Sequence, residues 1–157
     1  VLEREAAGGG CVGFYWPLAG EVDLRPLAIR PELVGRLALP AVTGGRLVYR
    51  RWSVAEAPQE DAAGVPAPPP AAGELAAAEL ALLLVPALAI DRRGLRLGYG
   101  GGWYDRLRSH SDWRRVPALA VLPSGCLLER LPRDPWDVPF DGWISERGLE
   151  RPGTQSP

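Results

Sequence analysis

Short apolar runs bounded by glycine, proline and other turn residues recur along this chain and alternate with two stretches that favour helix. Runs of this length and with these boundaries predict strands. The run LALLLVP at 80–86 is apolar throughout, which is typical of a central parallel strand. Strands are expected at 11–16, 37–42, 46–52, 80–86 and 116–122, with an edge strand at 143–145, and helices are expected at 26–36 and 103–111.

The alternation of strands and helices predicts an α/β fold with a mostly parallel sheet. Such sheets bind ligands outside the carboxyl ends of their strands. Residues 57–73 are rich in proline and alanine and predict a surface loop, because the part before them is too short to fold alone. We expect a single domain over 1–157, with a disordered tail at 147–157.

The composition of the chain limits the kinds of partner that the protein is expected to bind and the cellular compartment in which it is expected. The formal net charge is −1 and no basic stripe carries interleaved aromatics, which argues against a nucleic-acid partner. The longest apolar stretch, at 75–90, is interrupted by Glu79 and Pro86, so we expect no membrane span, and no signal peptide is recognisable. Cys11 and Cys126 predict free thiols in a reducing compartment, and we expect a cytoplasmic protein.

All 18 basic residues are arginine. Lysine Schiff bases, lysine general bases and a phosphate-binding lysine are therefore excluded, and phosphate chemistry here must use arginine, backbone N–H groups or a metal. The single histidine, His110, excludes a multi-histidine metal site and argues against a Ser-His-Asp triad. Its polar surroundings, RSHSD, predict an exposed residue at a helix end.

The segment LGYGGGWYDR at 97–106 carries the clearest chemical signal. Its glycines can adopt positive φ and let backbone N–H groups approach a ligand. These glycines are Gly98, Gly100, Gly101 and Gly102. A helix that begins near Trp103 points its positive end at the same place, which suits a phosphate, although no Gly-Lys-Ser/Thr comes after it as in a P-loop. The alternative is a turn that only joins a strand to a helix.

Charged residues surround this glycine loop. Arg92, Arg93 and Arg96 precede it and Arg106 comes after it, so planar donors for phosphate oxygens lie on both sides. Asp105, in the first helical turn, could hold a divalent cation beside a nucleotide. It could equally be an acid that the helix dipole favours.

Two further groups of acids are candidates for the same site. Glu21 and Asp23 lie after the strand at 11–16 and could face the ligand crevice expected outside the carboxyl ends of the strands, although a solvated turn is the favoured interpretation. Asp137 and Asp141 lie four residues apart and could supply a second carboxylate near a nucleotide. A loop with scattered acids explains that stretch equally well.

Three segments carry a family resemblance: YWPLAGEVDLRPL at 15–27, LLLVPALAIDRRGLRLGYGGGWYDR at 82–106 and LPRDPWDVPFD at 131–141. Together they resemble the 5-formyltetrahydrofolate cyclo-ligases, also called 5,10-methenyltetrahydrofolate synthetases, over residues 11–146. The resemblance implies a three-layer α/β/α fold, ATP and Mg²⁺ as cofactors, and 5-formyltetrahydrofolate as the small-molecule substrate. It further implies that ATP phosphorylates the formyl oxygen, after which N10 attacks the activated carbon and phosphate leaves.

The same resemblance implies roles for single residues. Asp105 and Asp137 match the family's magnesium carboxylates, and Glu21 matches a substrate-binding glutamate, whose carboxylate suits the ring donors of a pterin. Arg96 and Arg106 are the implied catalytic residues. The implied ATP contacts are Arg96, Leu97, Gly98, Tyr99, Gly100, Gly101, Gly102, Trp103 and Tyr104, and the implied folate contacts beside Glu21 are Tyr99, Gly100, Gly101, Gly102 and Trp103.

The sequence departs from the family's pattern in several places. Trp103 replaces a tyrosine, Ala67 a glutamate and Trp136 a histidine, and the proline-flanked Trp136 is expected to pack. Members of the family begin with a helical segment whose lysine and arginine bind ATP, and we expect this segment to be missing from the ten residues before Cys11.

Three hypotheses are consistent with the sequence. The first is a working cyclo-ligase, a monomer, whose natural chain extends beyond this sequence. The second is a degenerate or truncated homologue that binds folate or nucleotide without turnover. An unrelated phosphosugar or nucleotide enzyme on a similar sheet is kept as a third.

Overall fold

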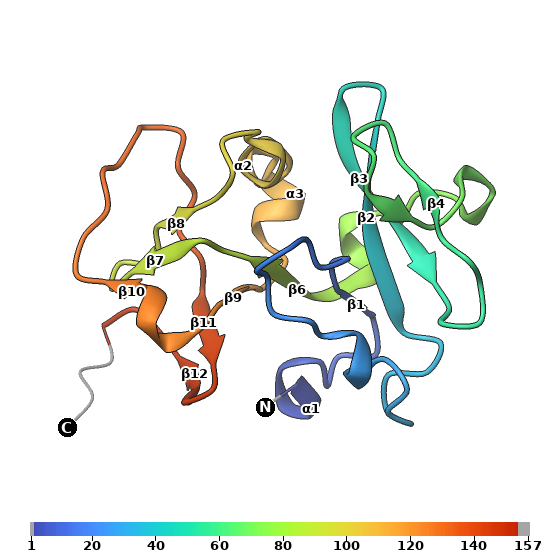
Figure 1. Ribbon diagram of the computed structural model, residues 1–157, viewed down its shortest axis with the longest axis horizontal. Coiled ribbons are helices and arrows are strands. Elements are labelled where there is room, and N and C mark those ends of the chain that lie inside the picture. The colour runs from blue at the N-terminus through green and yellow to red at the C-terminus, as the bar shows by residue number, and fades with distance from the viewer. Residues whose placement is uncertain (1, 154–157) are drawn as a thin grey trace.

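Seven strands form the main sheet of the protein, for which a computed structural model describes residues 2–153 (Figure 1). Their order across the sheet is β12, β11, β9, β6, β1, β2 and β3. Neighbours from β11 to β2 are parallel, whereas β12 and β3 are antiparallel strands at the two edges. The bounds are β1 Cys11–Gly13, β2 Leu37–Thr43, β3 Arg46–Trp52, β6 Leu80–Pro86, β9 Ala118–Val121, β11 Gly142–Ser145 and β12 Gly148–Glu150.

Smaller elements complete the fold. A three-stranded sheet contains β7 Ala89–Asp91, β8 Arg96–Leu97 and β10 Leu127–Leu128, and a two-stranded sheet contains β4 Gln59–Glu60 and β5 Pro66–Ala67. The helices are α1 Leu2–Glu5, α2 Trp103–Ser109 and α3 Ser111–Arg114, with 3₁₀ turns η1 Arg25–Leu27, η2 Pro70–Ala72, η3 Ala77–Glu79 and η4 Ser124–Cys126. No helix in this described part of the chain has the length and apolar character needed to cross a membrane.

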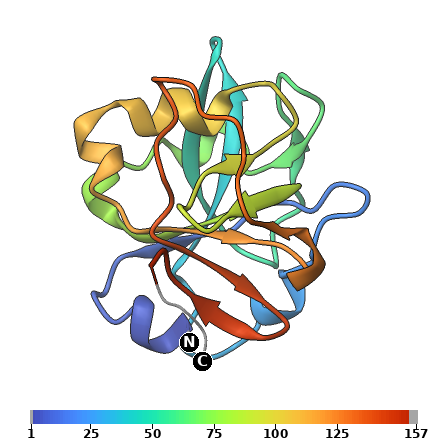
Figure 2. The same cartoon turned by 90° about the vertical axis from the view of Figure 1, so that its left-hand side faces the viewer.

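Alternate side chains of the central strands pack on opposite faces of the main sheet. In β6, Leu83 and Val85 join the cluster under α2 and α3, whereas Leu82 and Leu84 join the cluster with α1 and η1. A strand covered on both faces needs apolar residues at every position, which explains the unbroken apolar run. Helical segments lie above and below the sheet (Figure 2). The predicted three-layer α/β/α class with a mostly parallel sheet is confirmed, although its helices are short.

The strongest strand predictions are confirmed. Those at 37–42, 46–52 and 80–86 are β2, β3 and β6, and β6 is central because it pairs in parallel with both β1 and β9. The strands expected at 11–16 and 116–122 exist but are shorter than predicted.

The C-terminal part differs from its prediction. The strand at 143–145 is β11, but it is not an edge strand, because β12 pairs outside it in antiparallel fashion. Residues 148–150 therefore belong to the sheet and not to a disordered tail beginning at 147. Residues 154–157 of that expected tail lie outside the described part of the chain.

Two predictions between the strands are wrong. Residues 26–36 form no α-helix: η1 is succeeded by turns, because Pro31 lacks the N–H that a helix needs and Gly35 adopts a φ of 74°. The segment 57–73, expected to hold no regular element, contains β4 and β5, which pair with each other. Its Ala67 is buried with Ala41 and Val48.

The connections of the main sheet diverge at one place. From β1 the chain passes to β2 on one side, whereas from β6 it passes to β9 and then β11 on the other. Ligands of such sheets bind where the connections diverge, outside the carboxyl ends of the two strands. Here these ends are Gly13 of β1 and Pro86 of β6, so we call this place the crevice.

Gly13 leaves no room for a side chain. A Cβ there would lie 2.8 Å from Cε1 of Tyr49 and 2.9 Å from Cδ2 of Leu83, which are both fully buried. Overpacking displaces neighbours from their preferred rotamers, so Gly13→Ala should lower the free energy of unfolding by about 1–3 kcal/mol in denaturant titrations. Gly125→Ala is the control, because a Cβ there meets nothing within 4 Å. Equal unfolding free energies for the two variants would contradict this packing.

Candidate functional site

The segment after β1 brings Glu21 to the crevice. Its N–H donates to the carbonyl of Leu18 at 3.1 Å, and the N–H of Leu18 donates to Oε2 of Glu21 at 2.8 Å, so a turn holds the carboxylate. Within residues 2–153 no hydrogen bond uses its second oxygen. The negative charge of Glu21 acts on both Arg96 and Tyr104, which come from a distant part of the chain.

Arg96 of β8 joins the end of β6 to the glycine loop. Its Nε donates to the carbonyl of Pro86 at 2.7 Å, and its guanidinium lies 5.1 Å from the ring centre of Tyr104. Burial lowers the pKa of Arg96, while the negative charges of Asp105 and Glu21 act in the opposite direction. No hydrogen bond within the described residues uses its terminal nitrogens, which leaves these N–H groups for a ligand.

The glycine loop passes directly over two arginines. A Cβ on Gly98 would lie 2.6 Å from Nη1 of Arg96, and a Cβ on Gly102, whose φ is +66°, would lie 2.9 Å from Nη1 of Arg106. Arg106 also donates from Nη1 to the carbonyl of Gly101 at 2.8 Å, and its guanidinium lies 4.5 Å from the Trp103 ring. The small size of these glycines thus lets cationic side chains approach the backbone, which favours binding of an anion.

Asp105 and Asp137 come within electrostatic range of each other. Asp105 lies in the first turn of α2, whereas Asp137 lies in the segment 131–141. Burial raises the pKa of Asp105, the charge of Asp137 raises it as well, and the charge of Arg96 lowers it. A cation bound beside Asp105 would remove the penalty that burial and a neighbouring negative charge place on its ionised form. The role of Asp105 and Asp137 as metal ligands stays a prediction.

The acids and histidine of the described chain offer few ligands for a metal. Within residues 2–153 no group of three or more His, Cys, Asp or Glu side chains is arranged to hold an ion. Magnesium bound beside a nucleotide commonly uses one or two carboxylates and takes its other ligands from phosphates and water. The pair Asp105 and Asp137 fits that mode of binding.

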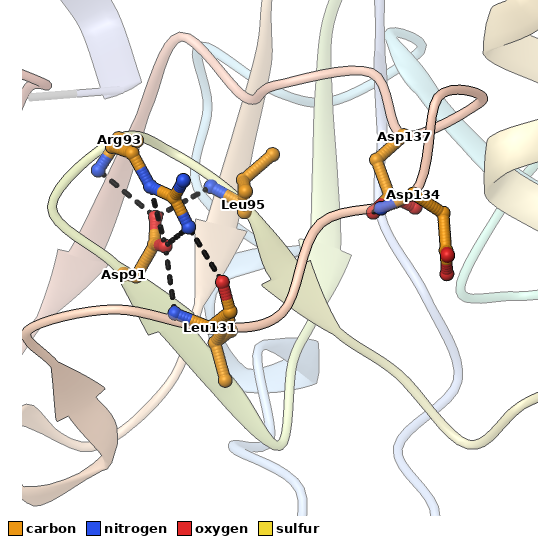
Figure 3. Close-up of polar contacts among 6 residues, drawn as sticks. All are labelled: Asp91, Arg93, Leu95, Leu131, Asp134 and Asp137. Atoms are coloured by element: carbon orange, nitrogen blue, oxygen red, sulfur yellow. Dashed lines mark hydrogen bonds and ion pairs between the residues drawn. The ribbon is translucent and has the colours of Figure 1, made fainter.

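Arg92 and Arg93, predicted to offer donors to a phosphate, are engaged elsewhere. Nε of Arg92 donates to Glu129 at 2.8 Å. Arg93 donates to the buried Asp91 from Nε at 3.0 Å and from Nη2 at 2.7 Å (Figure 3). Of the four arginines around the loop in sequence, Arg96 and Arg106 are the two that contact it.

Asp23 and Asp141 do not join the site either. Asp23 binds the side chain of Arg25 through both oxygens at 2.9 Å. Oδ2 of Asp141 accepts the N–H of Ala118 at 2.8 Å, which ties the start of β11 to β9. The contacts of Asp23 agree with the solvated turn that the sequence favours for it. Asp141 stabilises the fold and does not contribute to the site.

Two other expectations concern exposed residues. His110 ends α2 and is exposed, as predicted. Trp136 is 66% exposed, so the expectation that it packs is wrong. Its neighbours in the turn are polar or proline residues, which supply no apolar surface for the ring.

Sequence reasoning missed Arg108, which is only 2% exposed. It donates to the carbonyls of Val138 and Pro139 at 3.2 Å each and lies 4.3 Å from the ring centre of Phe140. Arg108 therefore connects α2 to the segment that carries Asp137. One signal was present, since residues three apart share a helix face and Arg108 lies three positions after Asp105.

A cavity of about 580 Å³ lies beside the site, on the β3 side of α2. Its walls include Leu47, Leu107 and Trp113, and the Arg46–Glu74 ion pair contributes charge. Arg106 lines this cavity and also contacts the glycine loop. The cavity is thus adjacent to the crevice, although Glu21, Asp105 and Asp137 are not among its lining residues.

Comparison with known proteins gives relatives of one kind. A segment of 71 residues is 42% identical to a 5-formyltetrahydrofolate cyclo-ligase of Mycolicibacterium smegmatis, covering 45% of this chain and 36% of that protein. Another, of 64 residues, is 43% identical to the Haemophilus influenzae cyclo-ligase, covering 40% of this chain and 33% of that protein. The matches therefore span about a third of the length of these curated relatives.

Solved structures agree with this result. The NMR structure of Aquifex aeolicus 5,10-methenyltetrahydrofolate synthetase matches 99% of this chain and 79% of that one, with a TM-score of 0.77 and 32% identity. The Mycoplasma pneumoniae 5,10-methenyltetrahydrofolate synthetase, with 21% identity and a TM-score of 0.61 over 87% of this chain and 73% of its own, shares the fold. The model of the 5-formyltetrahydrofolate cyclo-ligase family matches residues 34–146. Since that match covers well over half of the chain, the protein belongs to the 5-formyltetrahydrofolate cyclo-ligase family.

Proposed function

We propose that this protein converts 5-formyltetrahydrofolate to 5,10-methenyltetrahydrofolate, with hydrolysis of ATP to ADP and phosphate. The observation that carries this proposal is the convergence of Glu21, Arg96 and Asp105 beside the glycine loop, at the crevice of a sheet built like that of the cyclo-ligase family. Segments far apart in the sequence meet there, as a site for two substrates requires.

Arginine and backbone groups bind the phosphates of ATP in this proposal. Arg96 and Arg106 supply positive charge on either side of the loop, and residues 97–104 supply backbone N–H groups and aromatic walls. Phosphoryl transfer is catalysed mainly by positioning and charge neutralisation, so a protein without lysine can perform it. Both arginines are the proposed catalytic residues.

Asp105 and Asp137 are the proposed magnesium ligands. When bound, the ion supplies positive charge to the phosphate oxygens. The two aspartates fit this task because burial and the charge of Asp137 raise the pKa of Asp105, and a bound cation would remove that penalty on its ionised form. Asp105 also lies within electrostatic range of Arg96, so the aspartate and the arginine are proposed to act on the same phosphate groups.

Glu21 is the proposed ligand of the pterin. Its second carboxylate oxygen has no hydrogen bond within the described residues and suits the N–H donors of the ring. Tyr99, which is 57% exposed, and the backbone of Gly100–Trp103 are the proposed contacts with the rest of the folate. This arrangement would bring the formyl group between Glu21 and the phosphates.

The proposed chemistry uses these positions in two steps. The formyl oxygen attacks the γ-phosphorus of ATP, the bond to the β-phosphate oxygen breaks, and ADP leaves. N10 then attacks the activated formyl carbon, and loss of its proton and of phosphate closes the methenyl bridge. The protein's contribution is to hold the two substrates in line and to neutralise the charge that develops on the phosphoryl oxygens.

A monomeric cytoplasmic protein is part of this proposal. The formal net charge of −1 argues against a nucleic-acid partner, and the two cysteines favour a reducing compartment.

To test the function, the purified chain is mixed with 5-formyltetrahydrofolate and Mg-ATP, and the near-ultraviolet band of the methenyl product is followed. Growth of the band that depends on ATP is expected. Binding of both substrates without growth would instead indicate a homologue that binds without turnover.

Asp105→Asn should abolish turnover that depends on magnesium and leave the fold intact, because an amide keeps the shape and loses the charge that holds the ion. We expect kcat to fall by at least about 100-fold, in line with loss of one group that stabilises the transition state. Steady-state kinetics at several magnesium concentrations measure this. Asp112→Asn, an exposed aspartate in the first turn of α3, is the control. Equal loss in both variants, or normal metal dependence in Asp105→Asn, would refute the assignment.

Arg106→Ala should slow phosphoryl transfer more than it weakens folate binding. Its guanidinium contacts the loop proposed to bind phosphate and not the segment of Glu21, so kcat should fall by about 10²–10³ while the Kd for folate changes little. Single-turnover kinetics and folate titration separate the two effects. Arg115→Ala, an exposed arginine after α3, should match the unaltered protein. A larger loss in folate affinity than in rate would give Arg106 a different role.

A further inference from the structure

The buried carboxylate of Asp91 lies outside the proposed catalytic groups, yet it is the most heavily hydrogen-bonded acid near them. Asp91 is 0% exposed and lies at the end of β7. Its Oδ1 accepts the N–H groups of Arg93 at 2.9 Å and Leu95 at 3.0 Å, and its Oδ2 accepts the N–H of Leu131 at 2.9 Å. These bonds outweigh the cost of burial, so the pKa of Asp91 is lower than usual.

Asp91 and Arg93 together bind both backbone groups of Leu131. The N–H of Leu131 donates to Asp91, and its carbonyl accepts Nη2 of Arg93 at 2.5 Å. Arg93 donates to Oδ2 of Asp91 as well, so its guanidinium bridges two acceptors (Figure 3). The pair fixes a residue that lies 40 positions further along the chain. We call these contacts the Asp91–Arg93 clamp.

The segment that starts at the clamp carries Asp137. Six positions after Leu131, Asp137 closes a turn: its N–H donates to the carbonyl of Asp134 at 3.1 Å, and its Oδ2 accepts the N–H of Asp134 at 2.7 Å. Beyond this turn, Arg108 holds the carbonyls of Val138 and Pro139. The turn is therefore held at both ends, by the clamp before it and by α2 after it.

The clamp and Arg96, which is proposed to bind phosphate, belong to one hairpin. β7 and β8 pair through Ile90 and Arg96, so Asp91 and Arg96 are carried by the same short structure. Asp105, at the other side of the proposed ion, is connected to the far end of the segment through Arg108 on the same helix. A shift of Leu131 would thus move Asp137 relative to both Arg96 and Asp105.

We propose that Asp91 and Arg93 are positioning residues that hold Asp137 at the distance from Asp105 which a divalent cation needs. This inference rests on the proposed function, because it uses the same two metal ligands. Groups that orient metal ligands without touching the ion typically change metal affinity by about 10- to 100-fold when they are removed.

The variant that tests the clamp is Arg93→Ala, with Arg92→Ala as its matched control. Removal of Asp91 would leave three backbone donors unpaired and Arg93 without its ion-pair partner, so that variant risks a general loss of stability. The Arg93 side chain is 35% exposed, and its loss keeps the backbone bonds to Asp91. Arg92 is its sequence neighbour and also forms an ion pair, but its partner Glu129 is exposed and outside the clamp. In Arg93→Lys one ammonium cannot bridge both acceptors with the same geometry, so an intermediate effect is expected.

Two measurements on the full chain are needed. Amide hydrogen exchange without metal should show the amides of Arg133, Asp134, Trp136 and Asp137 exchanging at least about tenfold faster in Arg93→Ala, with the amides of β6 and β9 unchanged. Electron paramagnetic resonance with Mn²⁺ and a non-hydrolysable ATP analogue should show metal affinity about tenfold weaker, within the range for orienting groups. Arg92→Ala should match the unaltered protein in both.

The outcomes separate the two proposals. Unchanged exchange at these four amides, or faster exchange there with unchanged Mn²⁺ affinity, overturns the positioning role. If exchange in Arg93→Ala is faster throughout β6 and β9, the variant is destabilised as a whole and Arg93→Lys decides. Arg93→Lys with normal exchange in β6 and β9 should still show the local and metal effects. Their absence means that Arg93 serves stability alone and overturns the positioning role. If the unaltered protein binds neither Mn²⁺ nor the analogue, the proposed function fails, and the metal role of the clamp fails with it.

Discussion

The parallel pairing of β1 with β6 is the contact on which the remaining structure depends. It joins Val12 to Leu82 and Gly13 to Leu83 in the middle of the main sheet, and it sets the two strand ends side by side. Because the chain leaves these ends in opposite directions, the segments after them cannot cover the space between. A small residue is required in the pair, since Tyr49 and Leu83 occupy the volume beside Gly13. The crevice is thus a consequence of topology and of one glycine, and its chemistry is added by the segments that leave the two strands.

The chain leaves β6 into a hairpin too short to have a core of its own. β8 has two residues, and the hairpin is held through polar groups: Arg96 to the carbonyl of Pro86, and Asp91 to backbone N–H groups on both sides of the turn. Hydrogen bonds are directional, so they fix the orientation of the hairpin backbone, whereas apolar contacts are not directional and fix it less closely. The residues nearest the proposed reaction are therefore held by charge and geometry, and the apolar core lies behind them.

The larger features of this fold could be predicted from the sequence, and the fine ones could not. Unbroken or bounded apolar runs identified β2, β3 and β6, because both faces of a covered sheet demand apolar residues. The pairs of strands with two or three residues, β4 with β5 and β7 with β8, left no periodic signal, since tertiary contacts alone stabilise them. For the candidate site, Arg96 and Asp105 could be proposed because they adjoin the glycine loop in the sequence, whereas Glu21 could be proposed only from the family resemblance. The partners of Arg93, Asp141 and Arg108 were not, because each binds backbone atoms 23 to 38 positions away, and backbone atoms carry no identity in a sequence.

The use of arginine as a bridge gives this chain an unusual sensitivity to change. Arg36 holds the carbonyls of Ala6 and Gly10, Arg108 holds those of Val138 and Pro139, and Arg93 holds an acid and a carbonyl at once. Each guanidinium presents several donors in one rigid plane, so it can satisfy two acceptors that a single ammonium group cannot reach together. The exchange of arginine for lysine is therefore expected to be mild on the exposed surface of this protein and more damaging at these three points. Arginines of the exposed surface are therefore freer to change to lysine than these three bridging residues.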